Sequence, residues 1–199
     1  MITIVVFLLQ VSFATIDLEQ QAAEAYVKAD FANSLKLIDQ ILEQKHKITS
    51  PRRLIGLIED IHVVQQPNAK NLFNSYQKLS RHMLPSYFRE QIAANIKILK
   101  PYHSQTAHLS KRALTSLAQD LYRRSQSSTA EPATTRAHQL LALLCLNQAR
   151  QNNKDFSPQA AFVRTTLASN IFPSLAEIEL KAFIKSYPKD KNVPEAQRR

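Results

Sequence analysis

The chain has 199 residues, of which 44% are hydrophobic, so it can bury a core in one domain or in two small ones. Its single glycine, Gly56, excludes the glycine-rich loops that cradle phosphates. The net charge is +10, and residues 45–150 carry sixteen basic and five acidic side chains. A basic region of this kind favours nucleic acid, anionic lipid or an acidic protein as partner, and the alternative is a solvated face of a basic protein.

The first residues share features with a secretory signal peptide. The apolar run Ile2–Leu9 precedes Ser12-Phe-Ala14, a small-x-small pattern that suits signal peptidase, although no Lys or Arg precedes the run. We predict that residues 1–14 are a signal peptide and that the mature protein is periplasmic or secreted. If the segment is not cleaved, we expect it to pack on the core of a cytoplasmic protein.

The next segments predict helices in succession. Asp17–Lys28 and Asp30–Gln44 have the pattern of a two-helix hairpin. Ser50 is expected to be the N-cap, and Pro51 the first residue, of a helix that ends near Gln66.

Prolines then divide the middle of the chain. Pro67 is expected to end one helix, and Asn68 to cap the next. The apolar residues of that helix fall on one face at helical spacing: Leu72, Phe73, Tyr76, Leu79 and Met83. Pro85-Ser86 is expected to open a further helix that ends before Pro101.

The second half of the chain continues the helical pattern. Thr106 is predicted to cap a helix, and residues 125–135, rich in Ser, Thr and Ala, to form a linker. Arg136–Gln151 is so apolar that we expect a central buried helix. Ser157-Pro158 starts the next helix, and Ser174–Glu177 has the sequence of a capping box.

The proline spacing and the first hairpin carry a resemblance to a known family. Pro51 to Pro85 and Pro67 to Pro101 are both 34 residues, which equals the period of tetratricopeptide (TPR) repeats. The first hairpin is similar to a TPR joint, with matching residues at Tyr26, Asp30, Phe31, Ser34, Ile38 and Leu42. Ala29 stands where the family usually has glycine.

The C-terminal joint, Glu177–Ala196, resembles the repeat boundary of TPR proteins of bacterial envelope assembly. Its matching residues are Phe183, Tyr187, Pro188 and Pro194, whereas residues 51–170 keep the helix rhythm but lack the family's signature positions. The resemblance implies an all-α fold of antiparallel helix hairpins stacked as a TPR-like α-solenoid. Helical arrays would then span residues 15–124 and 136–199.

The spacings of the histidines and the cysteine favour neither a metal site nor a catalytic cysteine–histidine pair. His103 and His108 are five residues apart, so one helix face would not present both to a metal. His138 and Cys145 would lie roughly 10 Å apart along a helix, too far for a thiolate–imidazole pair. The carboxylates of Glu59-Asp60 are expected to be exposed helix charges. We predict no enzymatic activity, no cofactor, and no catalytic, cofactor-binding or metal-binding residues.

The basic residues are the candidate partner-binding residues. Their spacing on three predicted helices suggests one electropositive strip: Lys78, Arg81, Arg89, Lys97, Lys100, Lys111 and Arg112. The TPR resemblance implies a protein-interaction scaffold that binds a protein or peptide partner, with no small-molecule substrate. The alternatives are a basic helical module that binds nucleic acid or anionic lipid, and a helical accessory domain of a larger enzyme.

Overall fold

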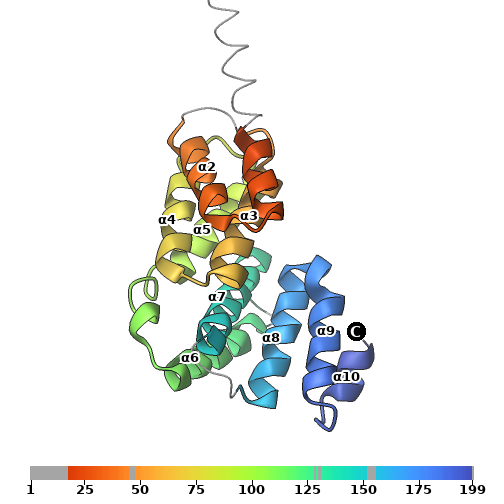
Figure 1. Cartoon of the computed structure of the whole chain (residues 1–199). Coiled ribbons are helices and arrows are strands. Elements are labelled where there is room, and N and C mark those ends of the chain that lie inside the picture. The colour runs from red at the N-terminus through yellow and green to blue at the C-terminus, as the bar shows by residue number, and fades with distance from the viewer. Residues whose placement is uncertain (1–17, 45–47, 128, 130, 152–155, 199) are drawn as a thin grey trace, which may run out of the picture.

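The computed structural model describes residues 18–44, 48–127, 129, 131–151 and 156–198. These residues form helices and turns without strands, which confirms the predicted all-α fold class (Figure 1). After a helix over residues 18–27, the elements are α2 (Phe31–Glu43), α3 (Pro51–Glu59), the π-helix η1 (Asp60–Gln65), α4 (Ala69–Leu79), α5 (Ser86–Leu99), the 3₁₀ turn η2 (Thr106–His108), α6 (Lys111–Ser125), α7 (Pro132–Gln151), α8 (Pro158–Ile171), the 3₁₀ turn η3 (Pro173–Leu175), α9 (Ala176–Ser186) and α10 (Val193–Arg198). The predicted signal peptide, residues 1–14, lies outside the described residues, so export stays a prediction.

The N-terminal hairpin forms where the sequence predicted it. Ala29 adopts φ 58°, a left-handed conformation that glycine tolerates better than alanine. The Asp30 carboxylate then accepts a hydrogen bond from the backbone N–H of Asn33 at 3.1 Å and caps α2. The hydroxyl of Ser34 donates to the carbonyl of Ala22 at 2.9 Å and holds the two helices together.

The start of α3 is capped by the preceding hairpin. Pro51 is its first residue and Ser50 its N-cap, as predicted, but the Ser50 side chain makes no capping hydrogen bond. The carboxylate of Glu19 instead accepts hydrogen bonds from the backbone N–H groups of Thr49, at 2.8 Å, and Ser50, at 3.0 Å. A carboxylate at a helix N-terminus also interacts favourably with the helix dipole.

The predicted helix from Pro51 to Gln66 has the expected length but changes geometry in its second half. From Asp60 onward the backbone is a π-helix, with the Gln66 N–H donating to the carbonyl of Ile61 at 2.7 Å. Short π segments leave carbonyl groups for other partners and often occur at functional sites. Glu59 and Asp60, expected to be exposed, are buried here.

Three local predictions are wrong. Thr106 begins a 3₁₀ turn, and Ser110 caps α6 by accepting from the Ala113 N–H at 3.3 Å. Met83 lies beyond the end of α4 and is 90% exposed, because the helix stops before it could turn inward. The proposed capping box at Ser174 does not form, since η3 occupies that position and α9 begins without a side-chain cap.

Helix α7 is the centre of the molecule, as predicted for Arg136–Gln151. It is buried continuously from Leu140 to Asn147, and it contacts α5, α6, α8 and η1 (Figure 1). Units of a regular solenoid contact only their neighbours, whereas α7 reaches back to η1. The arrangement therefore does not confirm a TPR-like solenoid.

The segment predicted as a linker, residues 125–135, is helical at both of its ends. Within residues 125–135, Ser125 is the last residue of α6, and α7 begins at Pro132. The two helices pack against each other along their lengths. A second, small core lies at the C-terminal end, where Leu180, Phe183 and Ala196 are buried together. No described helix combines the length and the apolar character needed to cross a membrane.

Candidate functional site

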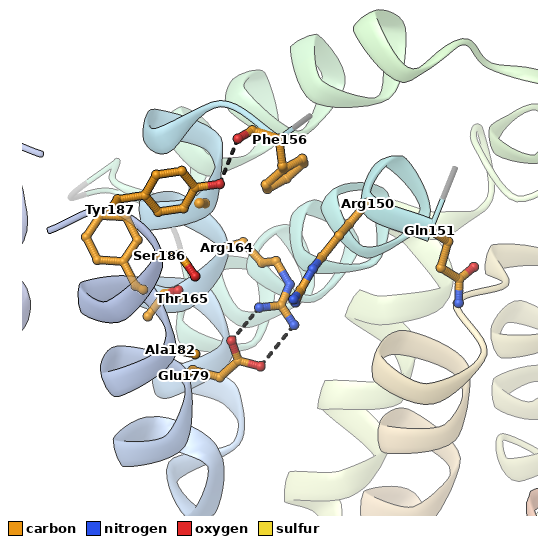
Figure 2. Close-up of a pocket in the computed structure, with 11 residues that line it drawn as sticks. Arg150, Gln151, Phe156, Arg164, Thr165, Glu179, Ala182, Ser186 and Tyr187 are labelled. Atoms are coloured by element: carbon orange, nitrogen blue, oxygen red, sulfur yellow. Dashed lines mark hydrogen bonds and ion pairs between the residues drawn. The ribbon is translucent and has the colours of Figure 1, made fainter. Parts of the chain in front are cut away.

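A cleft of about 810 Å³ lies where the end of α7 meets α8 and α9 (Figure 2). Its lining combines polar side chains with an aromatic wall formed by Phe156, Phe183 and Tyr187. The C-terminal residues that resemble a TPR boundary contribute to it, because Phe183 and Tyr187 are both lining residues.

The buried cation of the cleft is Arg164, on α8, which is 7% exposed. Its Nη1 and Nη2 atoms donate to the two carboxylate oxygens of Glu179 on α9, with an Nη2 to Oε1 distance of 3.0 Å (Figure 2). Its Nε donates to Oδ1 of Asn147 on α7 at 2.6 Å. The guanidinium is therefore fixed by a bidentate ion pair and by one amide, as buried arginines require.

The same amide continues to the π-helix. Nδ2 of Asn147 donates to the carbonyl of Val63 at 2.6 Å. In a regular α-helix this carbonyl would accept from the backbone N–H of residue 67, but Pro67 has none, so the carbonyl is free to accept from α7. We call the connected residues Val63, Asn147, Arg164 and Glu179 the polar relay.

A second arginine, Arg150, is the open cation of the cleft. It is exposed at the end of α7 and forms no ion pair with another described residue. Figure 2 shows its side chain extending toward the guanidinium of Arg164. Since Glu179 is the only carboxylate among the described lining residues, the cleft carries an excess positive charge.

The aromatic wall is held by its own contacts. The Tyr187 hydroxyl donates to the carbonyl of Phe156 at 2.8 Å (Figure 2). The rings of Phe183 and Tyr187 lie 5.5 Å apart between centroids, a favourable spacing for aromatic pairs. Exposed Ala182 and Ser186 lie beside them and leave room for a ligand.

The basic residues predicted from sequence fall into three separate hollows. Lys78 lines the first with Arg81, but its ammonium is paired with Asp39 and Glu43, each at 3.0 Å. These hydrogen bonds raise the pKa of Lys78, and the two carboxylates neutralise its positive charge. Exposed Arg81 lies just beyond α4.

The other two hollows lie on different helices. Arg89, Lys97 and Lys100 line one along α5. Lys111 and Arg112 line the other at the start of α6. The structure thus keeps each predicted set together without merging the seven residues into one hollow.

Sequence reasoning missed the arginines of the cleft. Arg164 lies on α8 between the buried residues Val163 and Thr165, and no pattern in the sequence distinguished it from an exposed helix cation. A polar residue within a strongly apolar helix was the available signal for Asn147, because such residues need an internal hydrogen-bond partner.

Burial favours the neutral forms of one cysteine and two histidines. Burial raises the pKa of the Cys145 thiol to about 12 and lowers the pKa of His62 to about 4. Burial also lowers the pKa of His138. Among the described residues, His, Cys, Asp and Glu form no group of three or more that could hold a metal ion.

Comparison with known proteins finds no matching family model, no matching curated protein and no matching solved structure.

Proposed function

We propose that the protein is a non-catalytic scaffold that binds a protein partner, and that the cleft between α7, α8 and α9 holds an acidic segment of that partner. The observation that carries this proposal is the open cation Arg150, which pairs with no described carboxylate and lies in a cleft with an aromatic wall. A carboxylate of the partner would pair with the guanidinium, and an adjacent apolar side chain would contact Phe183 and Tyr187.

The chemistry of the cleft supports binding over catalysis. The charge of Arg164 is already neutralised by Glu179, and the Tyr187 hydroxyl already donates a hydrogen bond to the backbone carbonyl of Phe156. No lining residue is a histidine or cysteine in the described part of the chain. The cleft therefore offers recognition groups, whereas a general base or an activated nucleophile would need a different set.

The resemblance of the C-terminal joint to TPR proteins of bacterial envelope assembly supports the same proposal. An envelope location belongs to the proposal too, and it rests on the apolar N-terminal run. Binding of nucleic acid or anionic lipid is the competing function, because the middle of the chain is basic.

Site-specific photo-cross-linking tests the proposal in cells that express the full chain. A photoreactive residue replaces Ala182, which is exposed at the cleft, and a second variant carries it at exposed Glu24, outside the cleft. We expect a protein adduct from position 182 only, reduced at least tenfold by the added substitution Arg150→Glu.

Two results would contradict the proposal. One is an adduct from position 182 that contains nucleic acid or lipid and no protein. The other is equal adduct formation with and without Arg150→Glu, since an interaction that depends on the cleft requires its open cation.

A further inference from the structure

A groove of about 510 Å³ runs along one face of α5, away from the cleft described above. Residues of α5 and its C-cap Lys100 line it at the spacing of a single helix face: Arg89, Ile92, Ala93, Ile96, Lys97 and Lys100. The helix packs against α4 and α7, and Ser80 and Leu84, which follow α4, also line the groove. The lining residues extend over roughly 16 Å of helix length.

The groove has an apolar floor and a basic rim. Ile92 is 1% exposed and Leu84 6% exposed, and both form the floor. Ala93 is exposed on the same face, where a small side chain keeps the groove open. The described lining residues include three cations and no carboxylate.

The three cations are available for a ligand. Lys97 and Lys100 are exposed near the C-terminal end of α5, and Arg89 is exposed one turn before the floor residue Ile92. None of the three forms an ion pair with another residue that the structure describes. In contrast, Lys78 on the neighbouring helix α4 is already paired.

We propose that this groove binds an acidic amphipathic helix of a partner protein. The apolar stripe of that helix would contact Ala93 and the partly exposed Ile96, and flanking Asp or Glu side chains would pair with the cations of the rim. Helix-in-groove recognition combines these two features, with apolar anchors at helical spacing and charge complementarity at the edge.

Other ligands fit the groove less well. Single-stranded nucleic acid is held by aromatic stacking platforms, and none of the described residues that line the groove is aromatic. A lipid surface is entered by apolar side chains that protrude, whereas Ile92 and Leu84 are recessed. The proposal does not depend on the function of the cleft, because the two sites have no described lining residue in common.

A display library of random helices of about 16 residues provides an unbiased test with the full chain as bait. Selection against the wild-type chain should enrich helices with an apolar stripe flanked by Asp and Glu. Enriched peptides are then synthesised, and fluorescence anisotropy measures their affinity for the variants described next.

Two variants remove the features of the groove separately. Arg89→Glu/Lys97→Glu/Lys100→Glu reverses the rim, and we expect it to weaken binding at least about tenfold. Ala93→Tyr fills the groove without changing its charge and should weaken binding to a similar degree. The matched control Lys28→Glu/Lys70→Glu/Lys189→Glu makes the same change in net charge at exposed positions and should keep affinity within about threefold.

Circular dichroism of each variant establishes that the helices are retained. The proposal is overturned if selection enriches no acidic amphipathic helices, or if the enriched peptides bind the rim-reversed chain as tightly as the control. It is also overturned if vesicles of phosphatidylserine or a single-stranded DNA bind through the same residues while no peptide does.

Discussion

Arg136 on α7 donates from both Nη atoms to the carboxylate of Glu59 on α3, at 3.0 and 2.5 Å, although 77 positions separate them in the sequence. The side chain of Glu59 is 2% exposed. The hydroxyl of Tyr76 donates to the same carboxylate at 2.7 Å, so residues from α3, α4 and α7 share one buried charge pair.

Removing one member of this pair should be more damaging than removing both. We expect Arg136→Met to lower the free energy of unfolding by about 3 kcal/mol, because Glu59 would remain buried without its cation. Urea denaturation measures the change. The exposed Arg150→Met is the control and should change stability by no more than about 0.5 kcal/mol.

The double variant Glu59→Leu/Arg136→Met distinguishes charge burial from lost packing. With both charges removed, we expect most of the stability to return. A double variant as unstable as the single one would show that the pair acts through its shape and contacts.

Stability should fall between neutral pH and about pH 4 because of His62. Its folded-state pKa is about 4, below the ordinary value of 6.5, and burial is the main cause. The unfolded chain therefore binds more protons than the folded chain in this interval. The contribution of neutral His62 to the free energy of unfolding is complete above pH 6.5 and is lost as the pH falls toward 4. The largest loss is about 3 kcal/mol.

Denaturation of the wild type and His62→Phe at pH 7.5, 6 and 5 isolates this contribution. Carboxylates titrate in both proteins, so the difference between them reports His62. The wild type should lose more stability than the variant, and parallel pH profiles would contradict the assignment.

Ala29→Gly should stabilise the protein by about 1 kcal/mol, because Ala29 adopts φ 58° at the turn of the first hairpin. Thermal unfolding measures the gain. Ala93→Gly, at an exposed position inside α5, is the matched control and should cost about 1 kcal/mol. A loss of stability in both variants would contradict a strained turn.

The same substitution at two buried asparagines should have opposite effects. Asn95 is 1% exposed, and neither polar atom of its side chain has a hydrogen-bond partner among the described residues. Asn95→Leu should therefore raise the free energy of unfolding by roughly 1 kcal/mol.

Asn147→Leu should lower that free energy by about 2 kcal/mol, since it leaves the Val63 carbonyl and the Nε–H of Arg164 without their hydrogen-bond partner. Chemical denaturation of the two variants side by side makes the comparison. Equal signs for the two changes would show that side-chain volume, rather than hydrogen bonding, decides the result.

Local signals predicted most helix boundaries. Asn68 and Ser157 cap their helices as expected, because a capping hydrogen bond joins residues three positions apart. The prediction that Thr106 caps α6 is wrong because Ser110 caps it instead. Both residue types can cap a helix, and the sequence alone does not show which of the two will do so. The prediction that Met83 lies on the apolar face of α4 is wrong because the sequence does not locate the end of that helix to within one turn.

The missed features depend on residues that are distant in sequence. Glu19 caps α3 from another helix, and Glu59 is buried because Arg136 approaches from α7. Phe183 and Tyr187 were named only as residues that resemble a TPR boundary, and no cleft was predicted there. Its arginines could not be recognised, because a sequence does not show which guanidiniums are neutralised by a carboxylate.

The polar relay places the cleft and the π-helix in one thermodynamic cycle. Hydrogen bonds run from Arg164 in the cleft through the amide of Asn147 to the carbonyl of Val63 on η1. If a ligand in the cleft makes local opening of η1 less favourable, then opening of η1 must weaken ligand binding by the same factor. Hydrogen exchange in residues 60–65 should then slow when the cleft is occupied, which would provide a readout of binding on the far side of α7.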